Sequence, residues 1–75
     1  MNILVYYFNK GKVTDYREIL MDDETNEGIV LMRVVSDLNN KSICEDIGVR
    51  PLKIMDRISI NDNLYEYNGR CFNKI

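Results

Sequence analysis

The densest group of side chains that could do chemistry in this sequence is a short run of carboxylates. Four acidic residues fall within one stretch of six, and they are Asp22, Asp23, Glu24 and Glu27. The ligand order, central glycine and closing glutamate of an EF-hand calcium loop are absent, so the stretch does not predict a metal site. A loop this charged, beside an apolar segment, can dock on a basic patch of another protein. We therefore expect these residues to form an acidic protein-binding surface; the alternative is a loop that is merely solvated.

A second group of useful side chains is basic and lies in the C-terminal part of the chain. Residues 43–58 resemble a helix-turn-helix, with Ile43 in a first helix, Gly48 at the tight turn and Ile54 in a second helix. This interpretation implies a small DNA-binding regulator. The cations that would then contact phosphates or base edges are Arg50, Lys53, Arg57 and Arg70. Two observations weaken it: residues 1–35 have the pattern of strands, and the formal net charge is −2.

The groups on which most enzymes depend are missing from the sequence. There is no histidine, no glycine-rich phosphate loop and no serine on a strand-to-helix turn. Two cysteines, Cys44 and Cys71, have no histidine to activate them and do not form a Cys-x-x-Cys pair. We expect both to be reduced, small apolar side chains. The sequence therefore predicts a protein that is not an enzyme and that uses no metal or cofactor.

Aromatic residues near the C-terminus offer one further chemistry, which is stacking on nucleic-acid bases. Tyr65 and Tyr67 fall on one face of an extended segment because side chains alternate along a strand, and Phe72 lies beyond the next turn. Only Arg70 and Lys74 are nearby cations. Packing of these rings in a core or at the edge of a sheet is the alternative.

The size and composition of the chain limit the class of protein. Seventy-five residues, 45% hydrophobic and 29% charged, indicate one small globular domain spanning 1–75. No apolar run reaches the ~18 residues of a transmembrane helix. The apolar residues 3–8 lack the basic start and the small-residue cleavage site of a signal peptide. We therefore expect a cytoplasmic protein that does not enter a membrane.

Five segments of β-prone residues are expected to position these side chains. They are residues 3–8, 13–21, 29–35, 53–60 and 64–72. Polar turns at Asn9–Lys12 and Asn61–Asn63 separate neighbouring segments. Asn68-Gly69 predicts a type I′ hairpin turn, because both central positions of that turn need positive φ. Ile29–Val35 is β-branched and almost wholly apolar, which favours a central strand that is buried on both faces or lies at a tight interface.

One short helix is expected near residues 42–47. Ser42 and Glu45 fit a capping box, and Gly48 is a natural C-terminal stop. Pro51 prevents a helix from running on through that glycine. From the proline to residue 58 the pattern fits either a strand or a second helix.

The segment Asp56–Tyr67 is similar to a strand-turn-strand phrase, Asp-x-Ile-x-Ile-Asn-Gly-x-x-Tyr-x-Val. This phrase recurs in SH3-like and other small barrels and in phage structural proteins. Asp62 replaces the usual glycine, and the similarity covers about one sixth of the chain. The resemblance implies a small β-rich fold and, since unrelated proteins share it, no particular activity.

Together these patterns predict an α+β fold: a mainly antiparallel sheet, or a small partly closed barrel, of about five strands with one short helix near residues 42–47. For a chain with sheet edges and no catalytic groups, the expected function is a small non-enzymatic binding module or inhibitor that acts through protein–protein contact. A second copy of the chain is an alternative partner, and nucleic acid is a less favoured one. The small size and the style of the sequence suggest that a phage or other mobile element encodes it.

Overall fold

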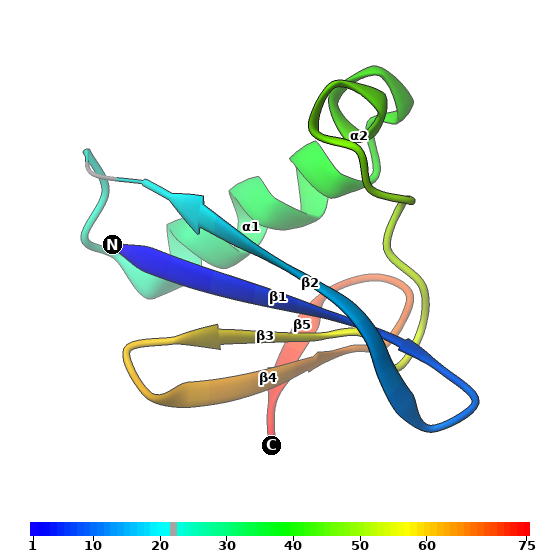
Figure 1. The fold of residues 1–75 in the computed structure, drawn as a ribbon. Coiled ribbons are helices and arrows are strands. Elements are labelled where there is room, and N and C mark those ends of the chain that lie inside the picture. The colour runs from blue at the N-terminus through cyan, green and yellow to red at the C-terminus, as the bar shows by residue number, and fades with distance from the viewer. Residues whose placement is uncertain (22) are drawn as a thin grey trace.

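The computed structural model, which describes residues 1–21 and 23–75, is an open five-stranded sheet with two helices on one of its faces (Figure 1). In chain order the elements are β1 (Asn2–Asn9), β2 (Lys12–Leu20), α1 (Glu27–Leu38), α2 (Lys41–Ile47), β3 (Arg57–Ile60), β4 (Asn63–Tyr67) and β5 (Phe72–Lys74). The strand order is β2-β1-β3-β4-β5, and every neighbouring pair is antiparallel. The predicted α+β class with a mainly antiparallel sheet is confirmed. Since β2 and β5 form two separate edges, the sheet is not closed into a barrel.

Two tight turns build the hairpins β1–β2 and β3–β4. Lys10 and Gly11 have φ angles of 53° and 77°, and Asn61 and Asp62 have φ angles of 49° and 68°. Positive φ at both central residues is the signature of a type I′ turn, whose twist matches that of the paired strands. The turns expected at both places are therefore confirmed.

The turn at Asn68-Gly69 is present but is not of type I′. Only Gly69 has a positive φ, +96°, and the side chain of Asn68 accepts hydrogen bonds from the backbone N–H groups of Arg70 and Cys71. The asparagine thus closes the loop with its side chain and does not enter the left-handed region. The loop spans residues 68–71 and divides the expected strand 64–72 into β4 and β5.

The central strand expected at residues 29–35 is wrong, because this segment lies in α1. Asn26 caps the helix: its side-chain oxygen accepts a hydrogen bond of 3.1 Å from a backbone N–H of the first turn. Val30, Val34 and Leu38 recur every four residues and are buried. Apolar neighbours on the less buried side of the helix hide this period in the sequence.

The short helix expected near residues 42–47 is confirmed as α2, but its cap differs from the prediction. Asn40 is the N-cap, since its side-chain oxygen accepts from the backbone N–H groups of Ser42 and of the next residue. The expected capping box of Ser42 and Glu45 is therefore wrong. Gly48 ends the helix in the left-handed region, with a φ of 76°, as predicted.

No second helix follows α2 within residues 48–75, all of which the structure describes. The chain runs without regular structure from Gly48 to Asp56 and then enters β3, which is shorter than the strand expected from residue 53. The two-helix geometry of the helix-turn-helix interpretation of residues 43–58 is therefore wrong.

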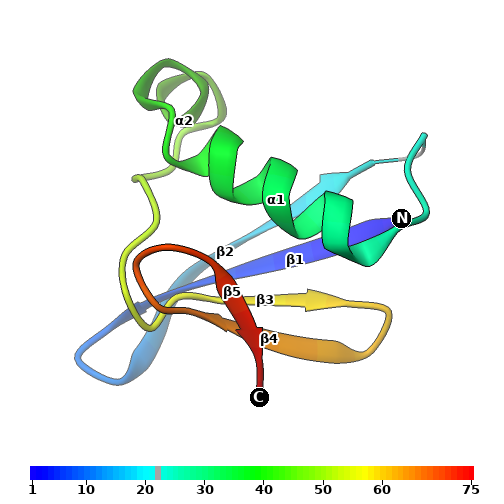
Figure 2. The same ribbon diagram turned by 180° about the vertical axis from the view of Figure 1, so that it is seen from behind.

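Alternation along the strands gives the sheet one buried and one uncovered face. The buried face packs against α1, and its side chains are Ile3, Val5, Tyr7, Ile58, Ile60, Tyr65, Tyr67 and Phe72. Leu4, Tyr6 and Phe8 of β1 alternate with these residues and therefore lie on the other face. Both helices lie on the same side of the sheet (Figure 1 and Figure 2). The described residues therefore form a two-layer structure, and none of their helices or strands covers the second face of the sheet.

Candidate functional site

The acidic residues expected to bind a partner precede or begin α1. Asp22 is outside the described residues. Asp23 has a side chain that is 81% exposed, and its carboxylate lies 3.8 Å from the guanidinium of Arg33. The carboxylate of Glu24 accepts the backbone N–H groups of residues 25 and 26, each at 3.0 Å. Glu24 therefore organises its own loop, whereas Asp23 faces solvent.

Glu27, in the first turn of α1, is committed to contacts within the chain. Its carboxylate accepts hydrogen bonds from the amide of Asn63 and the hydroxyl of Tyr65, both at 3.3 Å. Burial, together with this carboxylate, raises the pKa of the Tyr65 hydroxyl above its ordinary value. Glu27 thus ties α1 to β4 and is not a free member of an acidic surface.

Two of the basic residues assigned to the DNA-binding alternative are already paired with carboxylates. Arg50 makes a bidentate ion pair, with distances of 2.7 and 2.9 Å, to Asp56, whose side chain is fully buried. Arg57 lies 3.2 Å from the carboxylate of Glu66. The remaining two residues, which are exposed, are Lys53 and Arg70.

The buried carboxylate of Asp56 joins three segments of the chain. It accepts the backbone N–H of Phe8 at 2.9 Å and that of Lys53 at 2.8 Å, in addition to the guanidinium of Arg50. Arg50 also donates to the carbonyl of Phe8 at 3.0 Å and lies 4.9 Å from the centre of the Tyr7 ring. The hydrogen bonds to Asp56 raise the pKa of Arg50 above its ordinary value. The charges of Asp56 and Arg50 are thus satisfied within the chain, and the cluster stabilises the fold.

The aromatic residues expected to stack on bases lie in the core. Tyr65, Tyr67 and Phe72 are buried, and the ring centres of Tyr67 and Phe72 are 5.3 Å apart. The hydroxyl of Tyr67 accepts a hydrogen bond of 3.2 Å from the amide of Asn39. Because the rings pack in the core and expose little of their surface for stacking on bases, the core-packing alternative is confirmed.

Cys44 and Cys71 are both free thiols, with different surroundings. Cys44 is buried and donates to the carbonyl of Leu38 at 3.3 Å. Burial raises the pKa of the Cys44 thiol, which disfavours the reactive thiolate. Cys71 is exposed. Among residues 1–21 and 23–75, no group of three or more His, Cys, Asp or Glu residues could hold a metal ion.

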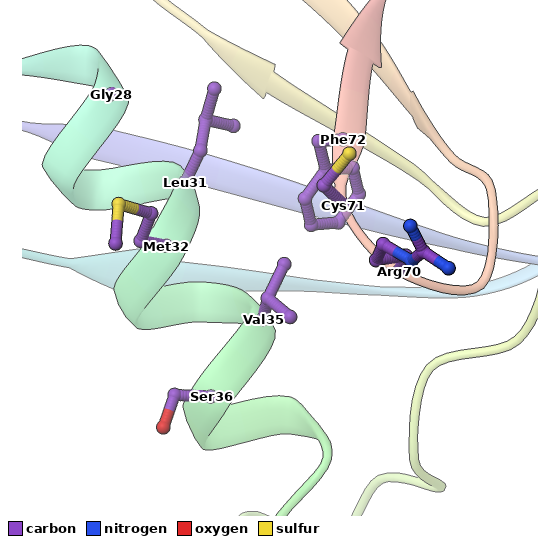
Figure 3. A pocket seen from close by; sticks show the side chains of 8 residues that line it. All are labelled: Gly28, Leu31, Met32, Val35, Ser36, Arg70, Cys71 and Phe72. Atoms are coloured by element: carbon purple, nitrogen blue, oxygen red, sulfur yellow. The ribbon is translucent and has the colours of Figure 1, made fainter.

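A groove that the sequence did not indicate lies between α1 and β5 (Figure 3). Its volume is about 400 Å³, and its lining residues are Gly28, Leu31, Met32, Val35, Ser36, Arg70, Cys71 and Phe72. Figure 3 shows Leu31 and Val35 on the α1 side and Phe72 on the opposite side. The walls are mainly apolar, with the guanidinium of Arg70 and the thiol of Cys71 at one side. Binding sites commonly combine an apolar cleft with a few polar groups in this way.

The groove lies beside the outer edge of β5, where no further strand of the described chain is paired. The carbonyl of Cys71 accepts, and the N–H of Ile75 donates, a hydrogen bond on the side of β4. Since backbone groups alternate in direction along a strand, those of Phe72 and Lys74 point away from β4. An added strand could therefore pair with these groups at the edge of the groove.

The sequence does not predict this groove because residues 29–35, which form one of its walls, have the pattern of a strand. The signal that could have revealed the wall is the spacing of Val30, Val34 and Leu38, taken together with Asn26 as a helix-capping residue. With α1 in place, Leu31 and Val35 would have been expected on the flank of the helix, beside its buried stripe.

Neither helix in the described part of the chain is long and apolar enough to cross a membrane. Comparisons with protein-family models, with curated proteins and with solved structures found no match to this chain.

Proposed function

We propose that the protein is a small non-enzymatic binding module that works through protein–protein contact and captures an extended segment of its partner along β5. The observation that carries this proposal is the position of an apolar groove directly beside the outer edge of β5. A strand added there would gain main-chain hydrogen bonds from Phe72 and Lys74, and its side chains would enter the groove. In this mode of recognition the main-chain bonds supply affinity and the side-chain pockets supply specificity.

The walls of the groove define which segment fits. Leu31, Val35 and Phe72 present apolar atoms on the α1 side of the sheet. Because successive side chains of a strand point to opposite faces, every second residue of the segment would enter the groove. We therefore expect aliphatic side chains at alternate positions. By occupying such a segment, the module could also act as an inhibitor of its partner.

Two cations flank β5 and set the preferred charge of the segment. Arg70 precedes the strand and Lys74 ends it; both are exposed, and neither forms an ion pair within the described residues. Carboxylates near the ends of the segment would pair with these cations. Such complementarity mainly raises the association rate, and salt screens it. The proposed ligand is therefore an extended peptide that is alternately aliphatic and acidic at its ends.

The DNA-binding alternative has less support from the same residues. Its second helix is missing, and Arg50 and Arg57 are paired with carboxylates, which leaves Lys53 and Arg70 exposed. The formal net charge of −2 also opposes binding of a polyanion. The acidic loop that contains Asp23 and Glu24 is still predicted to form a second contact with a protein partner. A charged loop of this kind would mainly raise the association rate.

Selection from a displayed library of random ten-residue peptides tests the proposal without assuming the sequence of the partner. We expect the enriched peptides to alternate aliphatic residues and to carry Asp or Glu near their ends. When such a peptide is titrated into the labelled protein, amide resonances of residues 72–74 and of the segment Leu31–Val35 should shift most. A double-stranded DNA oligomer, titrated in parallel, tests the DNA-binding alternative.

Two variants of α1 form a matched pair for this experiment. Met32 and Ile29 are both exposed apolar residues, 73% and 45% exposed, but only Met32 lines the groove. Met32→Glu places a carboxylate in the path of an acidic peptide, so we expect the Kd to rise about tenfold or more, while Ile29→Glu leaves it unchanged. The proposal is overturned if no peptide is enriched, if the shifts lie away from β5, or if the two variants lose binding equally.

A further inference from the structure

One face of the sheet turns away from both helices (Figure 1). The strand register places apolar side chains of β1, β2 and β4 on this face. The register pairs Tyr16 with Tyr6 and Val13 with Phe8, so these residues of β1 and β2 share that face. Leu64 joins them through β3, because Ser59 pairs with both Leu4 and Leu64. We call this surface the open face, and its apolar members are Leu4, Tyr6, Phe8, Val13, Tyr16, Leu20 and Leu64.

Much of the open face is in contact with solvent in the single chain. Tyr16 is 61% exposed, Leu20 60% and Val13 50%. A shallow hollow of about 280 Å³ lies in the middle of the face, and its lining residues are Tyr6, Phe8, Val13, Arg57 and Leu64. Contiguous apolar surface of this kind on a small protein marks an interaction site, whereas single exposed apolar residues do not.

The few charges on the open face do not favour nucleic acid. Arg57 and Glu66 neutralise each other at 3.2 Å, and Glu18 adds a further carboxylate. The guanidinium of Arg57 also lies 5.0 Å from the centre of the Phe8 ring, where a base would have to stack. A surface that is aliphatic, aromatic and slightly acidic fits another apolar protein surface better than a polyanion.

We infer that a second copy of this chain covers the open face, so that two sheets pack face to face in a symmetric dimer. The size of the face supports this occupant. β1 and β2 have 8 and 9 residues, and β3 and β4 have 4 and 5. With strands ~4.8 Å apart and a rise of ~3.3 Å per residue, these four strands present a face of roughly 400 Å² in projection. Side chains make its accessible area larger, and a standard interface removes ~800 Å² from each partner. A chain this short also buries only ~60% of its extended surface by itself, so it gains from a second copy.

The open face is self-complementary about an axis that runs along the strands between β1 and β3. Such a two-fold axis places β1 of one copy over β3 of the other, and β2 over β4, without shifting residues along the strand. Tyr6 and Tyr16 lie at the same level as Arg57 and Glu66. Each tyrosine ring would therefore meet the ion pair of the other copy, as a cation–π contact for Tyr6 and a hydroxyl–carboxylate contact for Tyr16.

Sedimentation equilibrium of the full chain tests this inference. We expect a mass of twice 8.8 kDa at high concentration. Tyr16→Glu introduces a charge at an exposed position of the open face and should raise the dimer Kd about a hundredfold. Ile47→Glu is the matched control, since Ile47 is 44% exposed and lies on α2, on the other side of the sheet. Circular dichroism confirms that both variants are folded.

Each outcome of this experiment decides the inference. A wild-type mass of 8.8 kDa up to about 1 mM, which is a binding free energy weaker than ~4 kcal/mol, overturns it. A folded Tyr16→Glu variant that stays dimeric also overturns it, because the dimer then uses another surface. Binding of the selected peptide to Tyr16→Glu, measured alongside, separates failure at the open face from failure at the groove.

Discussion

The buried carboxylate of Asp56 allows a quantitative prediction for the stability of the fold. Asp56→Ala removes the partner of Arg50 and leaves two backbone N–H groups, those of Phe8 and Lys53, without their acceptor. Breaking a buried ion pair by removing one member costs ~3–5 kcal/mol, because the other charge stays desolvated. The side chain of Arg50 is still 31% exposed, so water can reach its guanidinium and the lower end of that range applies.

The expected loss is a large part of the total stability. A domain of this length has a free energy of unfolding of about 4–11 kcal/mol. A loss of ~3 kcal/mol would therefore lower the urea midpoint strongly and could unfold a marginal domain at room temperature. Asp56→Asn should cost nearly as much, since its NH₂ group would face N–H donors in place of one carboxylate oxygen.

Urea unfolding, followed by circular dichroism, measures both variants against a matched control. Asp46→Ala removes a carboxylate from an exposed position of α2 and should change the free energy of unfolding by less than ~0.5 kcal/mol. If Asp56→Ala lost less than ~1 kcal/mol, the ion pair would contribute nothing beyond an ordinary hydrogen bond, and the account of this cluster would be refuted.

Three further substitutions have expected effects on stability. The hydroxyl of Tyr7 is buried without a hydrogen-bond partner among the described residues, and burial raises its pKa to about 12. The pKa of a tyrosine in the unfolded chain is near 10, so the free energy of unfolding should decrease as the pH rises from ~10 toward ~12. Tyr7→Phe should remove this decrease without loss of stability near neutral pH. Urea unfolding at neutral pH and at pH ~11 measures both effects. Gly69→Val should cost about 1–3 kcal/mol in thermal unfolding, because the φ of +96° is unfavourable for a β-branched residue and an added Cβ would lie 3.2 Å from Ile54; an unchanged Tm contradicts this. Met55→Gly should raise the Tm by several degrees, since Met55 has a φ of 85° at the third position of a turn closed by Asp56; a lower Tm would mean that its side chain packs usefully.

The parts of the fold that the sequence predicts are those specified by neighbouring residues. Gly11, Asn61 and Asp62 can adopt positive φ at low cost, so each turn, and with it each hairpin, follows from local chemistry. Gly48 marks the end of α2 for the same reason. The pairing of Arg50 with Asp56 depends on how the chain folds back after α2, and no local pattern encodes it.

The error at α1 and the missed groove have one physical cause. Ile29–Val35 has the pattern of a strand because it is apolar almost throughout. Leu31 and Val35 are apolar although they lie beside the buried residues Val30 and Val34. A helix that only covers a sheet usually carries polar residues at such flanking positions, so the helical spacing of its buried residues is visible in the sequence. Leu31 and Val35 are apolar where they line the groove, so the residues that disguise the helix are those that form the candidate site.

The two edges of the sheet differ in how readily they accept another strand. In β2 the register leaves Thr14 without a partner, since Val13 pairs with Phe8 and Asp15 with Tyr7, and the charged pair Asp15–Arg17 follows. A bulge and charged side chains are the usual means of keeping an edge unpaired.

β5 has an unbroken register with β4 and a groove beside it, but it has only three residues, Phe72–Lys74. Main-chain bonds to so short an edge give only part of the affinity, so side chains in the groove must supply the rest of the affinity as well as the selectivity. Peptide binding should therefore shift the amides of β5 and α1 while those of β2 stay unchanged. Because the groove lies on the helix side of the sheet, a second copy on the open face and a peptide on β5 can be bound at the same time.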